Sequence, residues 1–177
     1  MMRFLVFLWC IMPFSMTAQQ VIGLATRWND TFREWSIYTE DEELEGTLNL
    51  RWQDRWSEWE YRIGEVTGQI RQKWRDDPSA WELRSGMDII TIRTVWKDDF
   101  RNWRISNGRK QVTLKTRYGN LWDEWSLREA DGFFNIYTNF EGDPRDWVIE
   151  HDMDDSFNLS MQMALAFIAI YNSIPKE

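Results

Sequence analysis

Aromatic residues recur along this chain at a fixed interval, and that interval constrains the fold more than any other feature. Each repeat has a first aromatic and, seven residues later, a tryptophan. The first aromatics of successive repeats are 24 residues apart at the first step and 22 residues apart at each of the next four. The first positions are Trp28, Trp52, Trp74, Trp96, Tyr118 and Phe140, and the second positions are Trp35, Trp59, Trp81, Trp103, Trp125 and Trp147. Six copies of one unit indicate a protein assembled from repeated supersecondary elements.

Each repeat also contains segments in which apolar and polar residues alternate. The clearest segments are residues 88–96, 110–118 and 134–140, and a shorter one follows each second-position tryptophan. A period of two with β-branched and aromatic residues predicts half-buried strands. Two strands in each of six repeats predict about twelve strands, joined as an up-and-down meander.

Two kinds of turn are expected to join these strands. Ser85-Gly86, Asn107-Gly108 and Asp131-Gly132 predict tight hairpins, because glycine readily supplies a positive φ. The six residues between the two aromatics of a repeat predict a longer loop. We expect these two aromatics to face one another across the strand pair and to close its base.

The C-terminal region departs from the repeat. Residues 157–171 are apolar on every side of a helix, so residues 156–172 are predicted to form a buried helix. The preceding Asp154, Asp155 and Ser156 are expected to cap it. A meander with one apolar face needs a covering element, which predicts an antiparallel barrel that encloses the helix. An open sheet with the helix across it is the alternative.

This arrangement resembles the Tubby C-terminal-like superfamily, which includes the phospholipid scramblases and the LURP-one-related proteins. The resemblance covers residues 21–172 and depends on strand number, on hairpins such as residues 103–108, and on Asp154-Asp155 before the run Met-Ala-Leu-Ala-Phe-Ile-Ala-Ile. It implies a twelve-stranded barrel around a hydrophobic C-terminal helix, and it implies contact with lipid. The Tubby proteins bind phosphoinositides through lysines and arginines, whereas this chain is acidic, and no binding residue is carried over.

The N-terminus has the pattern of a secretory signal peptide. Arg3 provides a positive start, residues 4–14 are apolar, and a polar stretch follows. The apolar run is shorter than the ~20 residues that cross a bilayer. We expect cleavage near Ala18 or Gln19, which assigns residues 1–19 to the signal and 20–177 to one domain. The protein would then be exported to the periplasm, the cell surface or the extracellular space.

Cleavage would remove the only cysteine, Cys10, and with it any disulfide or cysteine nucleophile. The net charge is −8, and no run of basic residues occurs. Nucleic-acid binding is therefore not expected.

The regular spacing favours a structural role for the repeat tryptophans over a role in ligand binding. Sugars stack on exposed indoles, so Trp56 and Trp122, in the middle of two loops, are the candidates for ligand-facing residues. Two positions after the first aromatic, the repeats carry Asp30, Asp54, Asp76, Asp98, Asn120 and Gly142. Turn formation explains this position better than calcium binding does.

The sequence indicates no catalytic centre. His151 is the single histidine, so common nucleophilic triads and multi-histidine metal sites are excluded. The neighbouring Asp152, Asp154 and Asp155 are weak metal candidates, for which helix capping is the simpler explanation. We therefore predict no catalytic residues, no cofactor and no enzymatic activity.

Three functions are consistent with these features. The leading hypothesis is an exported, non-enzymatic barrel that binds a lipid, a membrane surface or an envelope protein through loops at one end, such as residues 38–45. One alternative is a carbohydrate-binding module that uses Trp56 and Trp122. The other is an envelope scaffold without a small ligand. The acidic residues at 40–45 are expected to form a solvated loop rather than a contact for a basic partner.

Overall fold

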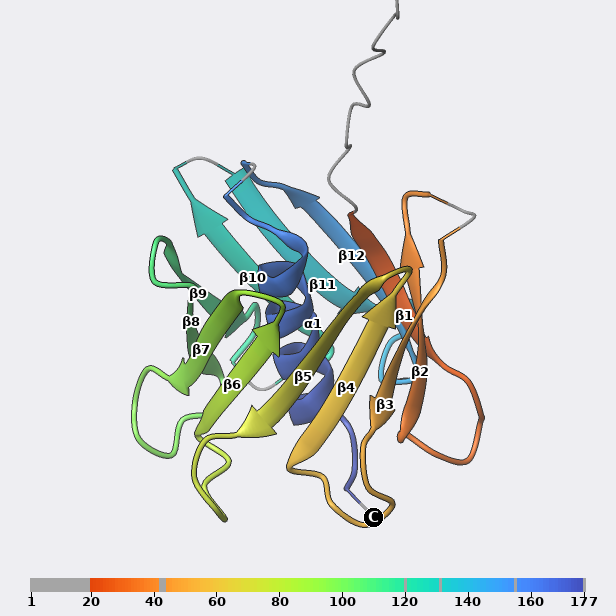
Figure 1. The fold of residues 1–177 in the computed structure, drawn as a ribbon. Helices are drawn as coiled ribbons and strands as arrows, with labels where there is room; N and C mark the ends of the chain where they lie inside the picture. The colour runs from red at the N-terminus through yellow and green to blue at the C-terminus, as the bar shows by residue number, and fades with distance from the viewer. Residues whose placement is uncertain (1–19, 42–43, 120, 131, 155, 177) are drawn as a thin grey trace, which may run out of the picture.

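The computed structural model describes residues 20–41, 44–119, 121–130, 132–154 and 156–176. Its strands form one closed antiparallel barrel in which each strand pairs with the next along the chain, and the last strand pairs with the first (Figure 1). The elements are β1 (Val21–Thr26), β2 (Glu34–Thr39), β3 (Gly46–Leu50), β4 (Glu58–Ile63), β5 (Val66–Gln72), β6 (Ala80–Ser85), β7 (Asp88–Thr94), β8 (Asn102–Ser106), β9 (Gln111–Thr116), β10 (Glu124–Glu129), β11 (Gly132–Thr138), β12 (Asp146–Asp152) and α1 (Leu159–Ser173). The predicted twelve-stranded meander is confirmed.

The barrel closes where β1 meets β12. Gly23 pairs with Val148, and Leu24 pairs with Trp147. A Cβ atom at Gly23 would lie 2.7 Å from the carbonyl oxygen of Trp147, so a side chain at this position would push the two strands apart. Closure leaves no unpaired sheet edge, which removes the main route to edge-to-edge aggregation.

The alternating segments place their apolar residues inside the barrel, as predicted. Along β9, Val112, Leu114 and Thr116 are buried, and the residues between them are exposed. Along β7, Ile90 and Ile92 are buried in the same way. The inward-facing side chains of all twelve strands and of α1 form one hydrophobic core.

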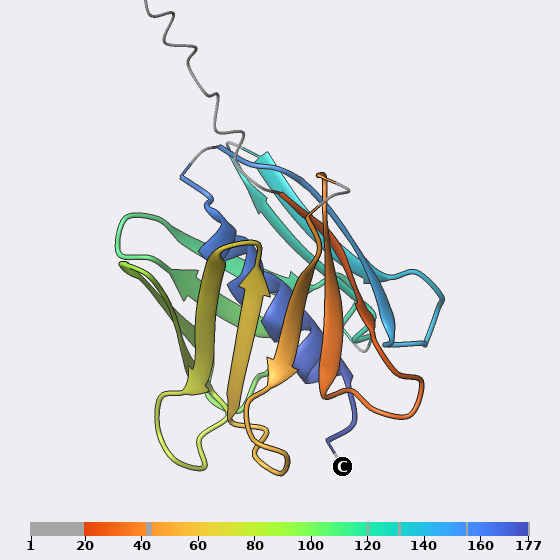
Figure 2. The ribbon, with the colours of Figure 1, turned by 45° about the vertical axis from the view of Figure 1, so that its right-hand side comes forward.

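Helix α1 runs through the interior of the barrel from one end to the other (Figure 2). Every residue from Ser160 to Tyr171 is buried. The Phe167 ring makes edge contacts with the rings of Trp59 and Trp81, at centroid distances of 5.8 Å and 5.0 Å. The predicted enclosed helix is confirmed, and the alternative of an open sheet is wrong.

The helix begins later than predicted, and with a different cap. It starts at Leu159, and the side chain of Asn158 accepts a hydrogen bond from the backbone N–H of Met161. Asp154 instead accepts a hydrogen bond from the Lys110 ammonium at 2.7 Å. The predicted capping residue Asp155 lies outside the described residues.

The tight turns also differ in detail from the prediction. The connection between β6 and β7 is Gly86-Met87, because Ser85 still belongs to β6 and donates its hydroxyl to the Thr67 carbonyl. The connection after β8 has four residues, with Gly108 at a φ of 83°. Asp131 lies outside the described residues, as does the predicted signal segment 1–19. No helix in the described part of the chain has the length and hydropathy needed to cross a membrane.

Candidate functional site

The two ends of the barrel are closed by different kinds of connection. At one end lie six loops of seven residues each, namely 27–33, 51–57, 73–79, 95–101, 117–123 and 139–145. The hairpin turns and the segment that leads into α1 occupy the other end (Figure 1). We call these the loop end and the hairpin end. The loop end is formed by six loops of equal length, and the C-terminus of α1 lies there (Figures 1 and 2).

The second-position tryptophan of each repeat anchors its loop. All six of these indoles are buried, with at most 2% of each exposed. In every repeat the indole N–H donates to the carbonyl three residues earlier, at 2.7–3.0 Å. The position therefore requires both the apolar bulk of an indole and its hydrogen-bond donor, which explains why it is tryptophan throughout.

The predicted ligand-facing residues Trp56 and Trp122 lie beside these anchors. Trp56 is half-buried, with its ring 5.7 Å from that of Trp59. Trp122 is 37% exposed and lies 5.8 Å from Trp125, and its carbonyl also accepts a hydrogen bond from the Ser173 hydroxyl. Both therefore pack against the core, and neither is among the most exposed aromatics of the loops.

The first-position aromatics are exposed, contrary to the expectation that they face the second-position tryptophans. Their exposed fractions lie between 51% and 70%. The strands end just before these residues, so the inward-outward alternation no longer applies to them. We call this set the aromatic rim, and it consists of Trp28, Trp52, Trp74, Trp96, Tyr118 and Phe140. Because all six loops lie at one end of a closed barrel, the rim surrounds that end.

Polar partners hold several rim aromatics in place. The indole N–H of Trp28 donates to Glu34 at 3.1 Å, and that of Trp52 donates to Glu58 at 3.0 Å. The cation one residue earlier lies over the ring in three repeats: Arg51 on Trp52, Lys73 on Trp74 and Arg117 on Tyr118, at 5.4–5.8 Å. A cation directly before the aromatic is thus a sequence signal that could have revealed the exposed rim.

The acidic position that follows the rim aromatic has a conformational explanation. Asp76 and Asp98 adopt positive φ values of 60° and 62°, and Gly142 occupies the same position at 75°. Asp, Asn and Gly tolerate this left-handed region better than other residues do. These backbone angles account for Asp76 and Asp98 as turn residues.

The two ends differ strongly in formal charge. The six loops contain ten Lys or Arg and nine Asp or Glu, a net charge of +1. The described residues of the connections at the hairpin end contain two Lys or Arg and five Asp or Glu, a net charge of −3. The acidity of the chain is therefore concentrated away from the aromatic rim.

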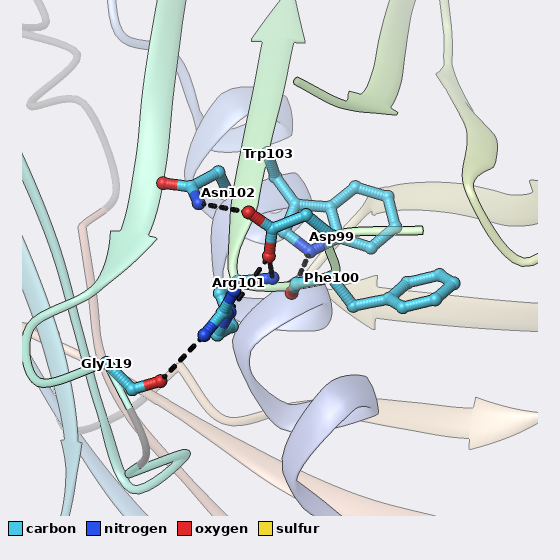
Figure 3. Close-up of polar contacts among 6 residues, drawn as sticks. All are labelled: Asp99, Phe100, Arg101, Asn102, Trp103 and Gly119. Carbon is cyan, nitrogen blue, oxygen red and sulfur yellow. Dashed lines mark hydrogen bonds and ion pairs between the residues drawn. The ribbon is translucent and has the colours of Figure 1, made fainter. Parts of the chain in front are cut away.

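Arginine side chains connect neighbouring loops, as Arg101 and Arg145 illustrate. Figure 3 shows the first, in which Asp99 accepts hydrogen bonds from the backbone and side chain of Arg101, and Arg101 donates onward to the Gly119 carbonyl at 3.3 Å. Arg145 makes the same bridge to the Asn29 carbonyl at 3.3 Å and is held by Asp143. The second bridge joins the last loop to the first and so fastens the loop end across the closing strand pair.

A groove of about 610 Å³ lies between the second and third loops. Its lining residues are Arg55, Ser57, Glu58, Arg71, Gln72, Trp74, Arg75 and Asp76. It combines one wall from the aromatic rim with polar side chains that donate and accept hydrogen bonds. No sequence pattern pointed to it, because its residues come from two loops and from the adjoining strands β4 and β5.

The weak metal candidates do not come together in the described part of the chain. Within it, no group of three His, Cys, Asp or Glu side chains is arranged to hold an ion. Asp154 is paired with Lys110, whose hydrogen bond lowers the pKa of Asp154 to about 2. The His151 ring stacks on Phe134 at 5.9 Å, and burial lowers its pKa. Asp155 lies outside the described residues.

Comparison with known proteins identifies no relative. No protein-family model matches the chain, and no curated protein or solved structure is significantly similar to it. The resemblance to the Tubby C-terminal-like superfamily therefore stays a hypothesis based on architecture alone.

Proposed function

We propose that this protein is a non-enzymatic, exported binding module that docks on a membrane surface with its loop end. The observation that carries this proposal is the aromatic rim, which presents six exposed aromatic side chains around one end of a rigid barrel. Tryptophan and tyrosine are the residues favoured at the boundary between lipid and water, because the ring is apolar and its edge is polar. Large exposed apolar surfaces commonly mark interaction sites.

The charge distribution supports the same orientation. Biological membranes are commonly anionic, so the hairpin end, whose described connections carry a net charge of −3, is repelled from them. The loop end, at +1, meets no such barrier. The interior is filled by α1 and the inward side chains, so the proposed contact is made by the outside of the loops rather than by a lipid inside the barrel. This differs from the sequence-based choice of residues 38–45, which comprise the end of β2 and its connection to β3 at the hairpin end.

Co-sedimentation with vesicles tests this proposal. We expect the protein to bind phosphatidylcholine vesicles, with and without phosphatidylserine, and to remain bound at physiological salt because the contact is largely apolar. The double variant Trp96→Ala/Phe140→Ala removes the two most exposed rim aromatics. It should bind about a hundredfold more weakly, at roughly 1.4 kcal/mol for each aromatic.

The matched control is Met87→Ala/Ile89→Ala, which removes exposed apolar side chains near the hairpin end. This variant should bind vesicles as the unchanged protein does. Equal loss in both variants, or no vesicle binding under any condition, would contradict docking through the rim. A single stoichiometric protein partner in the absence of vesicle binding would instead favour the alternative of an envelope scaffold.

A further inference from the structure

The groove between the second and third loops lies at a place where the arginine bridge between loops is missing. A bridging arginine lies five positions after the rim aromatic of its own repeat, as Arg101 does after Trp96. It donates to a carbonyl of the next loop, that of the residue directly after the next rim aromatic, as in Gly119 after Tyr118. In the second repeat this position is Ser57, and the carbonyl that it would meet belongs to Arg75. Ser57 and Arg75 both line the groove. A bridge here would cross the space that the groove occupies.

The groove contains hydrogen-bond donors and acceptors side by side. Arg55, Arg71 and Arg75 contribute guanidinium donors, whereas Glu58 and Asp76 contribute carboxylate acceptors. Ion pairs orient these groups, since Arg55 lies 3.3 Å from Glu58 and Arg75 lies 3.6 Å from Asp76. All of them are at least partly exposed, so a ligand can replace these pairs at small cost.

The carboxylate of Glu58 is kept in its ionised form. Hydrogen bonds from the Trp52 indole and from Arg55 lower the pKa of Glu58. At neutral pH it therefore acts as an acceptor and carries a negative charge. A ligand that offers only acceptors, such as a phosphate, could pair with the guanidinium groups but would leave Glu58 and Asp76 without donors.

We propose that this groove binds a saccharide, which stacks on Trp74 and exchanges hydrogen bonds with the surrounding charged side chains. A sugar hydroxyl both donates and accepts, so it satisfies the guanidinium and carboxylate groups together. The exposed Trp74 ring supplies an apolar face for the C–H side of a sugar. A groove of about 610 Å³ has the size of a small-ligand site. The inference rests on the proposed function in one respect: the saccharide is taken to be the headgroup of a glycolipid in the surface on which the rim docks.

Restoring the missing bridge provides a sharp test. The double variant Arg55→Asp/Ser57→Arg copies the pair formed by Asp99 and Arg101, and it should place a guanidinium across the groove. A second variant, Trp74→Ala, removes the stacking face without filling the space. Screening the purified protein on an array of neutral and uronic-acid oligosaccharides should yield a bound sugar, and both variants should weaken its binding at least tenfold in titrations.

Two matched controls should leave saccharide binding within twofold of that of the unchanged protein. Ser79→Arg introduces an arginine at the equivalent position of the third repeat, and Ser79 does not line the groove. Asp77, two residues earlier, already accepts a hydrogen bond from the backbone N–H of Ser79 and corresponds to Asp99 beside Arg101. Trp96→Ala removes a rim aromatic outside the groove. Absence of binding to every oligosaccharide, binding that the bridged variant retains, or displacement of the sugar by inorganic phosphate would overturn the saccharide site.

Vesicles separate this inference from the proposed function. Phosphatidylcholine vesicles that carry a glycolipid with the bound sugar should retain the protein at least tenfold better than plain vesicles, and the bridged variant should lose this gain. Plain-vesicle binding should be unchanged in the bridged variant, because it depends on the rim as a whole. A free sugar that binds without any gain from its glycolipid would overturn the membrane source of the ligand. Loss of plain-vesicle binding with retained sugar binding would overturn rim docking alone.

Discussion

Each repeat of this barrel carries two aromatics seven residues apart, of which one is buried and the other exposed. The second-position tryptophans are buried, and each donates its indole N–H to a loop carbonyl. The first-position residues are more than half exposed and include tyrosine and phenylalanine. The buried position therefore has one residue type in six repeats, whereas the exposed position requires only an aromatic ring. The comparison shows that equal regularity in a sequence can reflect packing at one position and surface chemistry at another.

The largest expected effect concerns the core in which the second-position tryptophans lie. Phe167→Asp would place a charge between Trp59 and Trp81, where the wild-type ring contacts both indoles. An unpaired buried charge costs several kcal/mol, so this variant should not fold. Circular dichroism and thermal unfolding would measure the loss. Met87→Asp, at a fully exposed residue, is the control and should fold normally.

A graded pair of substitutions tests the buried position itself. Trp103→Ala should lower the free energy of unfolding by about 3–5 kcal/mol, because it leaves a large cavity. Trp103→Phe keeps most of the bulk but leaves the Phe100 carbonyl without its indole donor, so it should cost roughly 1–3 kcal/mol. Urea unfolding would give both values. A negligible cost for Trp103→Phe would show that the hydrogen bond contributes nothing, whereas equal costs for the two variants would show that the bulk of the ring contributes nothing beyond the hydrogen bond.

The pH dependence of stability tests how well the interior excludes charge near the hairpin end. Burial lowers the pKa of His151 in the folded protein below its usual 6.5, while Glu40 and Asp152 oppose the shift. The unfolded chain therefore binds a proton more readily, and stability should decrease as pH falls below about 6.5. Thermal midpoints between pH 8 and 5 would show this, and His151→Gln should remove that part of the decrease.

Asp154 titrates in a separate window and provides the internal control. Hydrogen bonds from Lys110 and, next in size, from Ser156 lower its pKa to about 2, so its contribution to stability is present above pH ~4 and is lost as pH falls towards 2. Above pH 5, Asp154→Asn should therefore leave the slope of the thermal midpoint against pH unchanged. A change of slope above pH 5 in this variant would contradict the assignment to His151.

The smallest expected effect on stability belongs to the rim. Trp96→Ala removes a side chain that is 70% exposed, and surface changes of this kind usually alter the free energy of unfolding by less than about 0.5 kcal/mol. Urea unfolding beside Trp103→Ala would measure the difference between the two positions of one repeat. A cost near that of Trp103→Ala would show that the rim is part of the core.

Much of the fold could be predicted because it depends on local patterns. The alternation in residues 110–118 identified β9, and the apolar run at 157–171 identified a buried helix. The cap was misassigned because Asp154 and Asn158 are equally suitable residues in isolation. In the folded chain Asn158 accepts the capping hydrogen bond from Met161, whereas Asp154 accepts from Ser156 and from Lys110, which lies 44 residues earlier in the chain.

The candidate site was much less predictable. Trp56 and Trp122 were chosen because they lie in loops, but they pack on the neighbouring indoles at 5.7 Å and 5.8 Å. The rim was taken as structural because it shares the spacing of the buried tryptophans. The periodicity of a strand ceases to determine the direction of a side chain where the strand ends, and this happens just before each rim aromatic.

The sequence by itself determined the number of repeats, the alternation of the strands and the apolar character of the helix, because each depends on residues that are close along the chain. Closure of the barrel decided the rest. It brought six distant loops to one end, concentrated negative charge at the other, and left a groove between the second and third loops. These features depend on which repeats become neighbours in space, and that follows only from the packing of twelve strands around one helix.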